Sequence, residues 1–132
     1  MDSPVCQPSD LRLLGNIAFL AARMRWREES DRIFEALADV VETKADLLFA
    51  WMSARCETGD LPGAGEVLAR MEKLPADAAE IVMMARCYFL CCCNSPEWVD
   101  IARRVTRTGP QTFGYGTASA MLTEHAGRQR AG

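Results

Sequence analysis

Histidine and long apolar runs are nearly absent from the sequence. Its 132 residues include one histidine, and arginines interrupt each apolar stretch before the ~18 residues that a membrane-spanning helix needs. The first residues, Met1 to Pro4, carry no basic segment, and no continuous apolar segment follows them as in a cleaved secretion signal. We therefore expect no integral membrane segment, no Sec signal and residence in the cytoplasm.

Motifs for catalysis are also missing. The stretch Gly114-Tyr115-Gly116 lacks the further glycines and the preceding strand of a phosphate-binding loop. His125 lies near the end of the chain, in a predicted C-terminal helix, so a Cys-His nucleophile pair is not indicated. We expect a protein that is not an enzyme and that binds no cofactor.

The charge balance does not suit nucleic acid. The formal net charge is −3. Residues 1–102 hold 10 basic and 17 acidic residues, a balance of −7, whereas residues 103–132 hold five arginines against Glu124 alone, a balance of +4. Phosphates require a broad basic surface, so we expect no nucleic-acid partner. The basic C-terminus is interpreted as a helix end and solubilising tail, with an acidic partner as the alternative.

Six cysteines are present, but four of them lie in one short segment: Cys87, Cys91, Cys92 and Cys93. Cysteines this close cannot cross-link distant parts of a fold, which indicates reduced thiols. Cys87 and Cys91 are one helical turn apart and could share a soft metal, yet a structural zinc site needs four ligands. We expect small core-filling side chains and no metal; S-acylation of residues 91–93 is a weaker alternative.

In place of strand-like alternation, the chain has helical apolar spacing and a weak internal repeat of about 34 residues. Two trios follow this period: Leu14, Leu48 and Val82, and Phe34, Leu68 and Ala102. Repeats of this length are typical of tetratricopeptide-like helical hairpins, which stack because one hairpin cannot bury its own apolar face. The sequence predicts an all-α, tetratricopeptide-like solenoid of three helical hairpins plus a C-terminal capping helix.

The domain organisation follows from size and composition. A chain of 132 residues, 49% apolar and 25% charged, is typical of one soluble globular domain. We predict a flexible N-terminus over residues 1–8, a single helical-repeat domain over 9–126 and a disordered tail over 127–132. The capping helix is expected over 117–126, with Met121 and Leu122 covering the open end of the stack.

Helix boundaries are predicted from capping residues. We expect Ser9, Thr43, Asp60 and Ser95 to cap four of the helices, and Asp77 with Glu80 to form a capping box. Four sets of apolar residues are expected to face inward: Leu13, Ile17, Leu20 and Met24; Ile33, Phe34, Leu37, Val40 and Val41; Leu61, Ala64, Val67, Leu68 and Met71; and Trp98, Ile101, Ala102 and Val105.

An Ala-Arg pair recurs in three of the expected helices and suggests a partner-binding groove. Its arginines are Arg23, Arg55 and Arg86. In a tetratricopeptide stack the first helix of each hairpin lines the concave face, where arginines could bind carboxylates of a peptide. Phe49 and Met83 are candidate apolar contacts in this groove. The alternative is that each arginine is solvated and covers apolar surface with its stem.

The segment Ala85 to Val105, ARCYFLCCCNSPEWVDIARRV, resembles the C-terminal part of the HrpB/HrpK family of bacterial type III secretion accessory proteins. The similarity lies in an aromatic-rich helix, a short turn and the Pro96-Glu97-Trp98 start of the next helix. Phe49-Ala50-Trp51 and Gly59-Asp60 look like the family's central hairpin. The cysteine run, and Arg25 where the first turn would favour Gly, depart from it.

The resemblance implies a small helical-repeat protein that serves a type III secretion apparatus and brings no catalytic residues. It suggests a chaperone-like adaptor that binds an amphipathic helix of a secretion component in a groove. The main alternative is a structural subunit that associates with itself or with other subunits. A cysteine-based metal or redox module is a third reading, and export through the secretion channel itself is an alternative to a cytoplasmic location.

Overall fold

The computed structural model describes residues 8–41 and 44–131, and these fold into helices with no strand among them. The elements are α1 (Pro8–Arg23), α2 (Arg27–Val40), α3 (Lys44–Glu57), α4 (Leu61–Met71), the short 3-10 helix η1 (Ala76–Ala78), α5 (Ala79–Cys92), α6 (Glu97–Thr108) and α7 (Tyr115–Ala131). The prediction of an all-α protein is therefore confirmed. Within the described residues, no helix is both long and apolar enough to cross a membrane.

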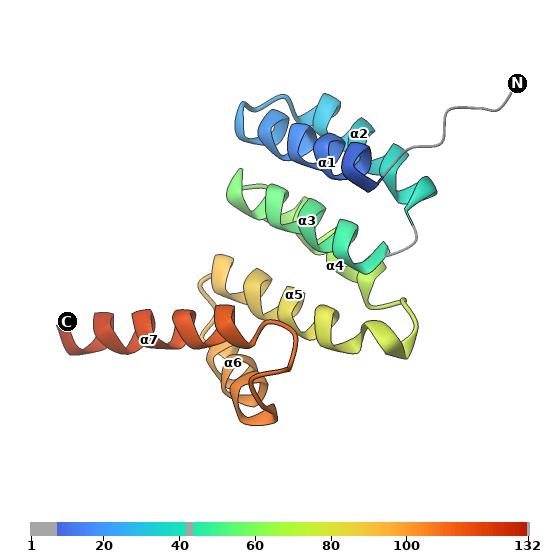
Figure 1. Cartoon of the computed structure of the whole chain (residues 1–132). Helices are drawn as coiled ribbons and strands as arrows, with labels where there is room; N and C mark the ends of the chain where they lie inside the picture. Colours follow the sequence, from blue (N-terminus) through green and yellow to red (C-terminus); the bar gives the residue numbers. More distant parts are fainter. Residues whose placement is uncertain (1–7, 42–43, 132) are drawn as a thin grey trace, which may run out of the picture.

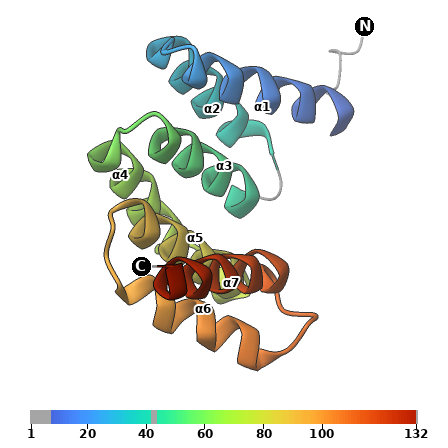
Figure 2. The ribbon, with the colours of Figure 1, turned by 90° about the vertical axis from the view of Figure 1, so that its left-hand side faces the viewer.

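Six of the helices form three consecutive antiparallel hairpins, α1 with α2, α3 with α4 and α5 with α6 (Figure 1). The hairpins follow one another in chain order, since α3 packs on α1 and α2, and α5 packs on α3 and α4. Helix α7 packs against α6 at the far end, as Figure 2 shows from the side.

The same turn ends the first helix of every hairpin. Arg25, Gly59 and Asn94 have positive φ angles of 65°, 83° and 60°. In each case the next backbone N–H donates to a carbonyl five residues back, as from Trp26 to Ala21 over 2.8 Å. This is the hydrogen bond of a Schellman C-cap, which requires a left-handed residue. These three turn residues lie 34 and 35 residues apart, so the period of the sequence corresponds to a repeated turn.

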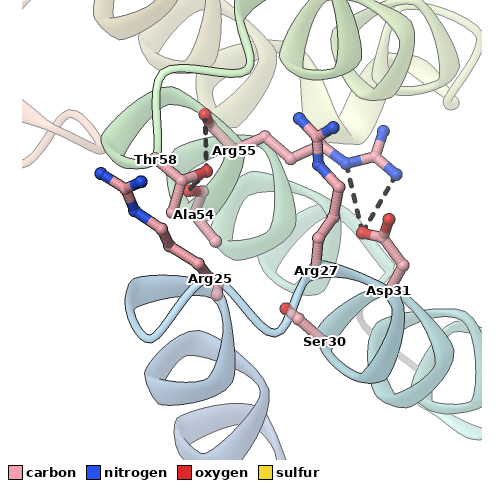
Figure 3. A pocket seen from close by; sticks show the side chains of 8 residues that line it. Arg25, Arg27, Ser30, Asp31, Ala54, Arg55 and Thr58 are labelled. Atoms are coloured by element: carbon pink, nitrogen blue, oxygen red, sulfur yellow. Dashed lines mark hydrogen bonds and ion pairs between the residues drawn. The ribbon is translucent and has the colours of Figure 1, made fainter.

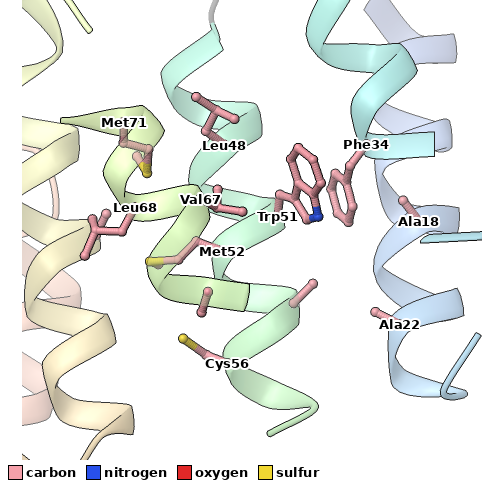
Figure 4. Packing of buried hydrophobic residues seen from close by; sticks show 13 residues of the cluster. Ala18, Ala22, Phe34, Leu48, Trp51, Met52, Cys56, Val67, Leu68 and Met71 are labelled. Atoms are coloured by element: carbon pink, nitrogen blue, oxygen red, sulfur yellow. The ribbon is translucent and has the colours of Figure 1, made fainter. Parts of the chain in front are cut away.

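The core consists of two hydrophobic clusters. The first joins the first two hairpins and one side of α5, and it centres on Phe34 and Trp51, whose rings stack at 5.8 Å (Figure 4). The second includes Met84, Cys87 and Trp98 and lies between α5, α6 and α7. Phe49 packs against both clusters. The repeat trio in the second helices is buried as predicted: Phe34, Leu68 and Ala102.

The prediction for the first helix is wrong. The side chains expected to face inward are 43–58% exposed: Leu13, Ile17, Leu20 and Met24. Helix α1 instead buries Ala18, Ala21 and Ala22, whose small side chains allow close packing against its neighbours. The hydroxyl of Ser30 on α2 donates to the Ala18 carbonyl over 2.7 Å, which requires this close approach. Val40 of α2 was also expected inside and is 60% exposed.

Most of the other inward positions are confirmed. Of the residues expected inside, α2 buries Phe34 and Leu37, α4 buries all but Leu61, and α6 buries all but Ile101. Leu61 and Ile101 are half-buried. Gly65 lies beside α5, where an added Cβ would be 3.5 Å from the Phe89 ring. The absence of a side chain at Gly65 therefore allows α4 and α5 to approach closely.

Of the predicted caps, Asp60 is confirmed, because its carboxylate accepts a hydrogen bond from the Gly63 N–H at 3.1 Å. Ser95 does not cap α6, whose N-cap position is Pro96 with no side-chain hydrogen bond. The Asp77–Glu80 box is absent because η1 precedes α5 there, and Glu80 instead accepts from the Phe113 N–H at 3.4 Å. Thr43 lies outside the described residues.

The ends of the domain differ from the predicted boundaries. Helix α1 begins at Pro8, and its predicted cap, Ser9, lies inside the first turn, while residues 1–7 lie outside the described part. Helix α7 begins at Tyr115 and continues to Ala131, so the tail predicted to be disordered from residue 127 is helical up to Ala131. An ion pair between Arg128 and Glu124, one turn apart, supports this extension.

Candidate docking site

The most exposed apolar surface of the described part lies on α1. We define the α1 stripe as Leu13, Ile17, Leu20 and Met24. At 100° per residue these positions fall within a sector of about 60° on one side of the helix. Leu14 and Trp26 add exposed apolar area at its border. Contiguous exposed apolar side chains on a soluble domain typically mark a site of protein contact.

Basic residues dominate the C-terminal end of the α1 stripe. From Leu13 to Arg23 the helix contains no acidic residue. At its C-terminal end lie Arg23 and Arg25, both with exposed side chains. The stripe is therefore apolar along its length and basic at one end.

Arg55, predicted to face a groove, is used inside the fold. Its side chain is only 16% exposed and lies 4.8 Å from the Trp51 ring centroid. It forms an ion pair of 3.1 Å with Asp31 on α2 and donates to the Gly63 carbonyl on α4 over 2.9 Å. These contacts tie three helices together, so Arg55 stabilises the stack.

Arg23 and Arg86 form separate ion pairs with exposed acids. Arg23 lies 3.1 Å from Glu57 at the end of α3, and Arg86 lies 3.4 Å from Glu72 just after α4. Counted back from their turn residues, Arg23, Arg55 and Arg86 occupy positions two, four and eight. A difference of two residues rotates a side chain by about 200°, so the Ala-Arg pairs do not align Arg23 with the other two.

A pocket of about 400 Å³ lies between the first hairpin's turn and the end of α3 (Figure 3). Its charged lining residues are Arg25, Arg27, Asp31 and Arg55. Arg27 is paired with Asp60, and Arg55 with Asp31. Asp60 and Asp31 thus neutralise the charges of two of the three arginines. The pocket lies at the contact between the first two hairpins and carries little net charge.

Phe49 and Met83, the predicted apolar contacts of the groove, are half-buried and belong to the core. Phe49 lies against Tyr88 and, edge to face, against Phe113, each with a centroid distance of 6.3 Å. Met83 packs against the second cluster. Both side chains contribute to packing between helices.

The five cysteines between residues 44 and 131 lie in the interior or at its border. Cys56 and Cys87 are buried, and Cys91, Cys92 and Cys93 are half-buried, all as free thiols. Burial, followed by the neighbouring Cys91, raises the pKa of Cys87 to about 11, and burial also raises the pKa of Cys56. Thiols with raised pKa values are poor nucleophiles at neutral pH. In the described ranges, no group of three or more potential ligands is arranged to hold a metal.

Comparison with known proteins adds no assignment. No family model matches the chain, and neither a curated protein nor a solved structure does. The resemblance to the HrpB/HrpK family therefore rests on the short motifs of the sequence.

The sequence reasoning did not find the α1 stripe as a site, although it identified these residues as one apolar face. The signal that could have found it is the alanine content of the opposite face, at Ala18, Ala21 and Ala22. A helix with one alanine face and one large apolar face has two candidate buried sides. Close packing uses the alanine side, which leaves the larger side chains for another contact.

Proposed function

We propose that this protein is a tetratricopeptide-like adaptor that holds an amphipathic helix of a partner protein. The tetratricopeptide assignment is supported by three hairpins whose first helices end in the same left-handed turn at 34- and 35-residue spacing. The observation that carries the docking function is the α1 stripe, four large apolar side chains left without cover at one end of the stack.

The proposed setting is a type III secretion system, with the protein as an accessory or chaperone-like component. This setting is supported by the resemblance of residues 85–105 to the HrpB/HrpK family. Holding an aggregation-prone helical subunit requires an apolar surface on a stable scaffold, and helix-in-groove recognition provides it. The docking surface proposed here is the α1 stripe instead of the groove expected from the Ala-Arg pairs, because Arg55 already contacts Asp31 and Gly63.

The test is a secretion assay in the bacterium that encodes the protein. We expect the Ile17→Asp, Leu20→Asp double variant to accumulate as a folded protein and to lose support for type III secretion. Val40→Asp is the matched control, because it places the same charge at an exposed apolar site on α2. Normal secretion with the double variant would contradict the proposed function.

The rival function, a self-associating structural subunit, predicts a different result for the isolated protein. Sedimentation of the purified chain distinguishes the two functions. An adaptor is expected to be monomeric alone, whereas a structural subunit forms oligomers that the double variant dissociates.

A further inference from the structure

We infer that the partner helix takes the place of a missing second helix: it lies antiparallel on the α1 stripe, with acidic residues at its N-terminal end facing Arg23 and Arg25. This inference rests on the proposed function and names the chemistry and orientation of the partner. It follows from comparing equivalent positions in the three hairpins.

The turn residues Arg25, Gly59 and Asn94 set the register of that comparison. Eight residues before the turn lie Ile17 in the first hairpin and Trp51 in the second. Five residues before it lie Leu20 and, in the third hairpin, Phe89. The α1 stripe therefore occupies the same positions as Trp51 and Phe89 do on their helices.

In the second and third hairpins, these positions contact the second helix of the preceding hairpin. Trp51 stacks on Phe34 of α2 with an interplanar angle of 11°. Phe89 lies against Gly65 of α4, 3.5 Å from where a Cβ would be. Among the described residues, α1 has no helix before it, and Ile17 and Leu20 are exposed. The helix face that the preceding hairpin covers on α3 and on α5 is therefore exposed on α1.

The internal contacts also give the direction of the missing helix. Helix α3 begins four residues after α2 ends and packs against it, so the two helices run antiparallel along their shared contact. A helix in the equivalent place on α1 runs antiparallel to it. Its N-terminal end then lies beside Met24 and the turn residue Arg25.

Charge complementarity indicates the composition of that end. At the contact between α2 and α3, Asp31 near the N-terminal end of α2 pairs at 3.1 Å with Arg55 in the last turn of α3. At the matching end of α1, Arg25 is exposed and lies near Arg23, which is 64% exposed and paired with Glu57. Acidic residues are also favoured in the first turn of a helix by its dipole. A second copy of the chain, placed antiparallel, offers one acid, Asp10, at the N-terminal end of its own α1, against the two arginines at this end.

The test uses a defined probe with the full chain. The acidic peptide is an 18-residue helix-forming peptide with leucines at spacings of three and four and three glutamates in its first turn; the lysine peptide replaces these glutamates with lysines. By fluorescence anisotropy, we expect the acidic peptide to bind at least tenfold more tightly than the lysine peptide. Ile17→Asp with Leu20→Asp should weaken its binding at least tenfold, and Val40→Asp should not.

Orientation is measured with a nitroxide on the peptide. A label at the N-terminus should broaden the methyl signal of Met24, and a label at the C-terminus those of Leu13. No saturable binding of the acidic peptide, equal binding of both peptides or the reverse broadening pattern would overturn the inference. A stable dimer that the double variant dissociates would overturn it as well, in favour of a second copy.

The two proposals fail separately. If secretion requires the α1 stripe but the peptide result is negative, the docking function stands and the partner chemistry is wrong. If the acidic peptide binds as expected but the double variant secretes normally, the inference about the surface stands and the proposed function is wrong.

Discussion

The indole of Trp51 donates a hydrogen bond to the Asp31 carboxylate over 2.8 Å, across the contact between the first and second hairpins. The same carboxylate oxygen accepts from Arg55 Nε at 3.3 Å. One acid on α2 thus satisfies an aromatic donor and a largely buried guanidinium. These two contacts leave Asp31 half-buried.

Replacing Asp31 with Ala is expected to destabilise the protein by about 2–3 kcal/mol, because it leaves a largely buried arginine and an indole N–H without their acceptor. Urea unfolding followed by circular dichroism measures the change. The control is Asp39→Ala, an exposed acid on the same helix, which should change the stability by under about 0.5 kcal/mol. Equal effects would show that the Asp31 contacts carry no net stability.

Two tryptophans provide a matched pair for testing the second cluster. Trp98 is buried and meets the His125 ring edge to face at 5.3 Å, whereas Trp26 is 55% exposed. Trp98→Ala should cost about 3–5 kcal/mol, since truncation leaves a cavity between helices. Trp26→Ala should cost under about 1 kcal/mol. Thermal melts of both variants check this, and a reversed order would contradict the assignment of the core.

Alkaline pH should weaken the fold. Burial raises the pKa of Cys87 from 9.0 to about 11 and that of Tyr88 from 10.0 to about 12. Above pH 9 the unfolded chain therefore loses protons that the folded chain keeps, and the free energy of unfolding falls as pH rises. Urea midpoints at pH 8 and pH 10.5 should show the loss.

The variant Cys87→Ala should reduce this pH dependence, because it removes one of the groups whose pKa burial raises. Cys93→Ala, a half-buried thiol at the helix end, serves as the control for the loss of a cysteine. A midpoint that does not change with pH in the wild-type protein would show that neither group stays protonated in the fold.

In the turn between α1 and α2, Arg25 has a strained backbone conformation that a glycine would relieve. Arg25 has a φ of 65°, where a side chain costs roughly 1–2 kcal/mol that glycine does not incur. Arg25→Gly should therefore stabilise the protein by up to about 1 kcal/mol, after allowing for the greater freedom of glycine in the unfolded chain. Arg32→Gly, in the middle of α2, should instead destabilise by about 1 kcal/mol. Denaturant midpoints of both variants test the contrast.

The sequence predicts well those features that repeat along the chain. Phe34, Leu68 and Ala102 were identified as core because a 34-residue period places each in the same environment, and all three are buried. The turn at Arg25 was expected from the family resemblance, and the structure shows that Gly59 and Asn94 are its equivalents. Local propensity does not reveal Asn94, since asparagine is not obligatory in a left-handed turn.

Features that depend on a neighbour were harder to predict. Apolar spacing shows that α1 has an apolar face but does not show which helix covers it, so Leu20 was assigned to the core and lies exposed. The Ala-Arg pairs have the same sequence but lie at different distances from the turn. For this reason Arg55 lies at the contact between hairpins, whereas Arg23 is exposed at the surface. The distance of a residue from the turn at the end of its helix decides which way its side chain points. That distance is known only once the turn has been located in the structure.

Phe49 has a consequence for the cooperativity of unfolding. Because its ring touches both hydrophobic clusters, loss of order around α6 and α7 also removes contacts from the helix that carries Trp51. A linear array of hairpins otherwise unfolds from its ends, since each unit depends mainly on its neighbours. Together with Ala85 and the packing of α5 on α3 and α4, this phenylalanine couples the two halves of the protein, and a smaller side chain at position 49 would weaken that coupling.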